Sequence, residues 1–215
     1  SSFEQLRPFT GRLAARGPIG GPLQALSNGT TTAVQGELGL AGGVITVQGR
    51  LTGGGGGELV PTTSPLDLRA LAGGAVPLGG GTLMADVRAR GNPHAPQADI
   101  ALLVDGARWR GTVVSANADA RYAGGTLHVE DATALAFGAY ATAAGDVRGL
   151  GGRAPALDAG VDVRGAQLAA LAHAFALPLR YPDGELDADL HARGSLSAPH
   201  VAGQVRIPAG SLNGL

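Results

Sequence analysis

The chain has 215 residues, a formal net charge of −1 and no cysteine, and all 16 of its basic side chains are arginine. The missing cysteine and lysine exclude disulfide frameworks, cysteine zinc sites, lysine Schiff bases and the phosphate-binding lysine of a P-loop. A near-zero charge with scattered arginines is not the footprint of a nucleic-acid-binding protein.

Small side chains dominate the apolar part of the composition. Hydrophobic residues make up 44% of the chain but aromatic residues only 4%, and 37 residues are glycine. The length suits one domain or a short piece of a repeat array. No apolar run reaches the ~18 residues that a membrane span needs. Because the chain begins with Ser1, without an initiating methionine or a signal peptide, we expect a piece of a larger protein.

Apolar and polar residues alternate along most of the chain, which is the pattern of strands with one buried face. In 157–164, for example, Val161 and Val163 fall on one face, and Asp162 and Arg164 fall on the other. The other expected strands are 38–40, 45–51, 83–90, 100–104, 114–122, 126–130 and 186–193. Glycine-rich segments between them predict hairpin turns, so the expected fold is nearly all β.

One segment breaks the two-residue period. In 166–176, Leu168 and Phe175 belong to a set of apolar residues at helical spacing, which predicts a short amphipathic helix. A weaker echo of this pattern lies at 66–72. The glycine run at 53–57 predicts a flexible loop, because a strand there would carry a heavy entropic cost.

A short phrase recurs along the chain, in which Ala-Arg-Gly is followed by a proline five residues after the glycine. The glycines of its copies are Gly17, Gly91 and Gly194, within internal repeats expected around 11–22, 81–104 and 184–207. Glycine permits a chain reversal, and proline cannot donate into a sheet. The phrase therefore predicts the end of one strand and the start of the next.

The C-terminal part of the chain resembles the TamB family of the translocation and assembly module and its AsmA-like relatives, which are built from repeating β-grooves. The resemblance rests on the helix expected at 166–176, on Ala198-Pro199 after the repeat phrase, and on the runs 203–207 and 209–212. It is clearest over this region and weakens toward the N-terminus.

The resemblance implies a long, curved antiparallel sheet that forms an open hydrophobic groove, a β-taco. It also implies a periplasmic location, with the full-length protein anchored in the inner membrane of a diderm bacterium. The expected function is that of a conduit for phospholipids between the two membranes, outer-membrane protein assembly, or both. The expected partners are phospholipid acyl chains and an outer-membrane barrel, and no cofactor is expected. The chain departs from the family in lacking an anchoring helix and in its glycine run at 53–57.

The residues themselves also favour a groove. Many inward positions of the expected strands are alanine, whereas facing sheets of a closed core are normally filled by large side chains. A curved sheet with small inward residues leaves room for an acyl chain, and each buried methylene contributes about 0.8 kcal/mol. The expected lining of this lipid groove is Leu38, Leu40, Ile45, Val47, Leu83, Val87, Ile100, Leu102, Val104, Val114, Leu127, Val129, Val161, Val163, Leu186, Leu190, Val205 and Ile207.

Two other architectures remain open at this point. The small inward residues of a β-sandwich or a β-solenoid would simply pack closely and leave no groove. A secreted β-solenoid that acts as an adhesin or structural passenger domain is therefore the alternative function. Such solenoids have rungs of nearly constant length, about 20–29 residues for the shorter repeats, and the repeat phrase here is spaced unevenly.

No arrangement of residues indicates catalysis or metal binding, so the chain is not expected to be an enzyme. Asp187 and Asp189 share one strand face and are interpreted as a solvated outer surface. Trp109, which lies between two arginines, is interpreted as a surface residue of an edge strand. No metal-ligand spacing occurs among the histidines, which are His94, His128, His173, His191 and His200.

Overall fold

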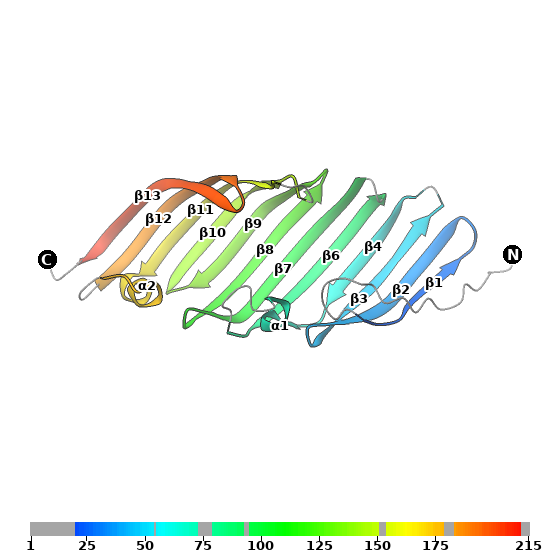
Figure 1. Ribbon diagram of the computed structural model, residues 1–215, viewed down its shortest axis with the longest axis horizontal. Coiled ribbons are helices and arrows are strands. Elements are labelled where there is room, and N and C mark those ends of the chain that lie inside the picture. Colours follow the sequence, from blue (N-terminus) through cyan, green and yellow to red (C-terminus); the bar gives the residue numbers. More distant parts are fainter. Residues whose placement is uncertain are drawn as a thin grey trace.

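The computed structural model describes residues 20–53, 55–72, 79–92, 95–150, 154–178 and 183–211. The elements are β1 (Leu23–Ser27), β2 (Thr31–Leu40), β3 (Gly43–Thr52), β4 (Gly57–Thr63), β5 (Leu66–Asp67), α1 (Leu68–Ala72), β6 (Thr82–Asn92), β7 (Ala95–Trp109), β8 (Thr112–Ala123), β9 (Thr126–Ala136), β10 (Ala139–Arg148), β11 (Ala156–Gln167), α2 (Leu168–Phe175), β12 (Asp183–Ser195) and β13 (Ala198–Ser211). The strands lie side by side along the long axis, with both helices at one long edge (Figure 1). We call this edge the helix edge.

The described strands form one open antiparallel sheet. Its order is β1-β2-β3-β4-β6-β7-β8-β9-β10-β11-β12-β13, and the short β5 pairs with β6 outside this path. The sheet is not closed into a barrel, and its form is consistent with a curved sheet. The predicted open all-β sheet is therefore confirmed, and the described strands form neither a sandwich nor a solenoid.

Four hairpins turn on two residues that both have a positive φ. This geometry matches the right-handed twist of the flanking strands, and it favours glycine at the second position. The turns are Ala41-Gly42 (φ 49° and 77°), Arg110-Gly111 (49° and 84°), Gly124-Gly125 (58° and 77°) and Phe137-Gly138 (55° and 75°). These turns set the regular up-and-down course of the sheet.

The repeat phrase forms the same hairpin twice. Gly91 lies directly opposite Pro96 in the β6–β7 pair, and Gly194 lies directly opposite Pro199 in the β12–β13 pair. Both glycines have a φ near 100°, at 100° and 106°. Each hairpin follows one of the two helices, α1 or α2. The strand end predicted at these two copies is confirmed, whereas Gly17 lies outside the described residues.

Two other predicted segments are shifted. The helix expected at 166–176 begins only at Leu168, because Ala166 and Gln167 still pair with β12. At 66–72 a short strand precedes helix α1. The loop expected at 53–57 is shorter than predicted, because Gly57 already belongs to β4 and pairs with Leu51 on β3.

The register gives the sheet one apolar face. Leu38 lies opposite Ile45, and Val87 lies opposite Ile100, so the apolar sides of neighbouring strands coincide. No second sheet covers this face in the described part of the chain, and few side chains are buried. The buried residues are Leu66, Ala107, Ala120, Phe137, Ala139, Ala166, Leu168, Ala172 and Ala188, most of which lie near the helix edge.

Glycines facing leucines bring neighbouring strands close together. A Cβ atom added to Gly49 would lie 2.3 Å from the carbonyl oxygen of Glu58 and 2.5 Å from Cδ2 of Leu59. At Gly36 it would lie 2.7 Å from Cδ2 of Leu23. Each leucine therefore lies over the backbone of a glycine on the next strand, which no larger residue would allow.

Candidate functional site

A hollow of about 320 Å3 lies on the apolar face over β7 to β11. Leu102 and Val104 bound it on the β7 side, and Val161 bounds it on the β11 side. Its floor is formed mainly by alanines on the three strands between, and Asn117, Thr133 and Thr142 of the same strands also line it. The alanines are Ala116, Ala118, Ala132, Ala134, Ala141 and Ala143. We call this hollow the alanine trough.

The register explains the floor. Ala116, Ala134 and Ala141 form one row across β8, β9 and β10, and the other three alanines form the next row. A methyl group reaches less far from the sheet than a branched side chain does. Because β7 and β11 carry larger residues at the same level, the surface drops between them and forms a trough.

The row next to the trough, toward the helix edge, is covered. Ala107 is 2% exposed, Ala139 is 6% exposed and Ala166 is 2% exposed, although all three belong to the apolar face of a single-layer sheet. Helix α2, whose Leu168 and Ala172 are buried, begins two residues after Ala166, and its Phe175 packs against two further aromatic rings at this edge.

Three aromatic rings from separate parts of the chain form this packing. Trp109 at the end of β7, Phe137 in the β9–β10 turn and Phe175 of α2 lie with ring centroids 5.6–5.9 Å apart. We call them the aromatic cluster. Trp109 packs edge-on against both phenylalanines, so its interpretation as a surface residue of an edge strand is wrong.

Arg110 holds α2 against this cluster. Its Nη1 donates a hydrogen bond to the carbonyl oxygen of Ala174, at 3.0 Å, near the C-terminus of the helix. Its guanidinium carbon lies 4.8 Å from the ring centroid of Phe175 and 5.7 Å from that of Trp109. A cation near the last carbonyl groups of a helix interacts favourably with the helix dipole, and a cation over an aromatic ring is attracted to the face of that ring. Arg110 therefore stabilises the C-terminal end of α2 through both contacts.

The predicted groove residues lie on the apolar face, but few of them line the trough. Leu102, Val104 and Val161 do so. The others lie elsewhere on the same face, and on β13 Val205 is 58% exposed and Ile207 is 38% exposed. Those other residues are Leu38, Leu40, Ile45, Val47, Leu83, Val87, Ile100, Val114, Leu127, Val129, Val163, Leu186 and Leu190.

The set of predicted lining residues omits the alanine floor, most clearly on β9 and β10. On these strands the smaller residues face inward and the larger ones face outward, which is the reverse of the usual arrangement. The inward residues are alanines, whereas Leu135 and Tyr140 face outward and are 57% and 49% exposed. The signal was the two-residue repeat of alanine itself, at 132–136 and 141–143.

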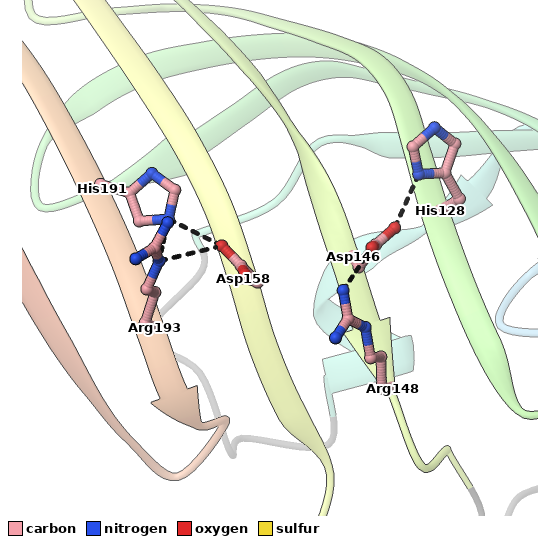
Figure 2. Close-up of polar contacts among 6 residues, drawn as sticks. All are labelled: His128, Asp146, Arg148, Asp158, His191 and Arg193. Carbon is pink, nitrogen blue, oxygen red and sulfur yellow. Dashed lines mark hydrogen bonds and ion pairs between the residues drawn. The ribbon is translucent and has the colours of Figure 1, made fainter.

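The outer face of the sheet carries ion pairs instead. His128 on β9 and Arg148 on β10 both contact Asp146, with Nδ1 of His128 2.7 Å and Nη2 of Arg148 3.0 Å from its carboxylate oxygens (Figure 2). The hydrogen bond from His128 and then that from Arg148 hold the pKa of Asp146 below its ordinary value.

A matching cluster lies on the neighbouring strands. Asp158 on β11 is directly opposite Asp146 in the register, and its Oδ1 lies 2.7 Å from Nε2 of His191 and 3.3 Å from Nε of Arg193 (Figure 2). The hydrogen bond with His191 is the main cause that lowers the pKa of Asp158. These contacts account for the two histidines without any ligand.

The stability of the protein is expected to fall in acid because of these clusters. A carboxyl group whose pKa is lowered by folding stabilises the folded state above its ordinary pKa, and this contribution is lost as the pH falls through the lowered value. We expect the melting temperature of Asp158→Asn to lie below that of the wild type at about pH 6, and the difference to shrink as the pH falls below about 4, the ordinary pKa of aspartate. Asp86→Asn, at a carboxylate without an ion pair among the described residues, is the control; an equal effect there would contradict the role of the cluster.

Neither metal ligation nor a membrane helix emerges from the described part of the chain. It contains no group of three or more histidine, aspartate or glutamate side chains placed to hold a metal ion. None of its helices has the length and apolar character needed to cross a membrane.

No protein-family model matches the chain, and neither a curated protein nor a solved structure matches it significantly.

Proposed function

We propose that the chain is a segment of a periplasmic groove that binds the acyl chains of phospholipids as they pass between the inner and outer membranes. The alanine trough carries this proposal, because it is an apolar hollow on an uncovered sheet face. The trough needs no cofactor and no catalytic group. The resemblance of the C-terminal repeats to TamB supports the location and the inner-membrane anchor of the full-length protein.

The energetics of the trough favour an alkyl chain over a polar ligand. A methylene moved from water onto an apolar surface contributes about 0.8 kcal/mol, and no polar partner is required. A polar group in the same place would lose its hydrogen bonds to water, since methyl groups supply none. The alternative of a β-solenoid adhesin finds less support, because the described strands are antiparallel neighbours in one open sheet rather than stacked rungs.

Filling the trough is expected to remove bound lipid. Ala143→Leu places a branched side chain on the floor, whereas Ala144→Leu adds the same group to the opposite, exposed face of the same strand. Native mass spectrometry of the chain purified from a bacterial host is expected to show phospholipid on the wild type and on Ala144→Leu, and several-fold less on Ala143→Leu. A wild-type chain without phospholipid, or two variants that retain it equally, would contradict the proposal.

Outer-membrane protein assembly is the second candidate function, and the exposed apolar side chains of β13 favour it. Val201 and Val205 on this strand are each 58% exposed and lie on the apolar face of the sheet. Exposed apolar side chains of this kind can contact the apolar side of an unfolded barrel strand. Crosslinking from a photoreactive residue at Val201 to a nascent barrel protein would support this function, and crosslinking to lipid alone would not.

A further inference from the structure

We infer that the alanine trough is closed at the helix edge, and that the aromatic cluster forms the end wall against which the methyl end of a bound alkyl chain lies. The inference rests on the proposed binding of acyl chains. The row of Ala116, Ala134 and Ala141 is the last one in the trough, and the next row contains the buried Ala107 and Ala139.

The orientation of the chain follows from the shape of the floor. The low floor is three strands wide, and strands in a sheet lie about 4.8 Å apart. Leu102 and Val161 rise on either side of it, so an alkyl chain longer than the distance between these walls extends along β8 to β10 rather than across the sheet. One end of such a chain then points toward the helix edge and the other toward the opposite edge.

The apolar character of the end wall determines which end of the ligand lies against it. Trp109, Phe137 and Phe175 present rings, and Phe137 is only 8% exposed. A charged head group held against these rings would lose its hydration without an adequate replacement. The methyl end has no hydrogen bonds to water to lose there, so it lies against the rings and the head group points toward the other edge of the sheet.

Arg110 is the positioning residue of this wall. It contacts no ligand in this arrangement, but it joins the β7–β8 turn to the C-terminal end of α2 through the Ala174 carbonyl and the Phe175 ring. Without it, the C-terminal end of α2 loses its hydrogen bond to the β7–β8 turn, and Phe175 loses the cation that stacks on its ring. Loss of Arg110 is therefore expected to open the wall while the sheet itself stays folded.

The single tryptophan provides the test, because Trp109 is the only one in the chain. The probes are stearic acid brominated near its methyl end and stearic acid brominated beside its carboxyl group, since bromine quenches an indole that it touches. For the complete 215-residue chain, we expect several-fold stronger quenching by the first probe. Equal quenching, or stronger quenching by the second probe, would overturn the end wall.

Two variants test the positioning role. In Arg110→Ala the difference between the two probes is expected to vanish, and in Arg108→Ala, at a side chain without a hydrogen bond to α2, it is expected to persist. Far-ultraviolet circular dichroism shows whether each variant keeps its sheet. An unchanged difference in Arg110→Ala would overturn the role of Arg110. Native mass spectrometry of the same samples separates the two proposals: no bound stearate contradicts the proposed function, whereas bound stearate without a positional difference contradicts the end wall alone.

Discussion

Gly49→Ala is expected to destabilise the protein by about 2 kcal/mol, which corresponds to a fall in melting temperature of roughly 6 °C. Replacing glycine by alanine in an unstrained position stabilises by about 0.4–1 kcal/mol, because it restricts the unfolded chain. At Gly49 the new methyl group would lie 2.3 Å from the carbonyl oxygen of Glu58. That oxygen belongs to the backbone of β4 and cannot rotate away, so the two strands must separate.

Gly160→Ala is the matched control. Gly160 is also a strand glycine, in β11, but a Cβ atom there would find no heavy atom within 4 Å. The variant is expected to be unchanged or more stable by about 0.5 kcal/mol. Thermal unfolding of both variants followed by circular dichroism checks the pair. Equal stability of the two would mean that the close approach of β3 and β4 does not constrain the sheet.

Local pattern was enough to predict the strands. Side chains alternate between the two faces of a strand, so the apolar positions of 83–90 and 157–164 indicated strands and their inward faces directly. The turns were similarly accessible, because a glycine at the second turn position, as in Ala41-Gly42, is what a two-residue hairpin requires.

Only part of the candidate site could be predicted from the sequence. Composition and alternation predicted small inward residues, but the trough exists because alanines on three neighbouring strands fall into register, and register is a property of the paired strands. On β9 and β10 the large residues Leu135 and Tyr140 face outward. A reading that assigns the bulkier residues to the buried side does not find a floor of alanines there.

The aromatic cluster could not be predicted from the sequence, for a different reason. Its three rings come from a strand end, a turn and a helix that are far apart in the sequence. The neighbours of Trp109 in the sequence are two arginines, which suggested a surface. What brings these rings together is the position of α2 at the helix edge, and no local pattern specifies that position.

Phe137→Ala is expected to cause the larger of the two losses of stability, about 3 kcal/mol. Phe137 is 8% exposed and contacts both other rings of the cluster. Its removal leaves a cavity beside Trp109 and Phe175, near the helix edge where the described sheet has most of its buried residues. Tyr140→Ala, three positions further along and 49% exposed on the outer face, is the control; its effect is expected to stay within about 0.5 kcal/mol.

A second substitution at the same position separates packing from backbone strain. Phe137 has a φ of 55°, a left-handed conformation that costs a residue with a Cβ about 1 kcal/mol. Phe137→Gly removes the ring but also this cost, so it is expected to be about 1 kcal/mol more stable than Phe137→Ala. Urea unfolding of the three variants gives both differences. If Phe137→Gly and Phe137→Ala are equally stable, the turn is not strained; if Phe137→Ala matches Tyr140→Ala, the aromatic cluster does not hold α2 on the sheet. The wild type is expected to be the most stable, followed by Phe137→Gly and then Phe137→Ala. This order is expected because the packing of the ring contributes more stability than the left-handed conformation of the turn residue costs.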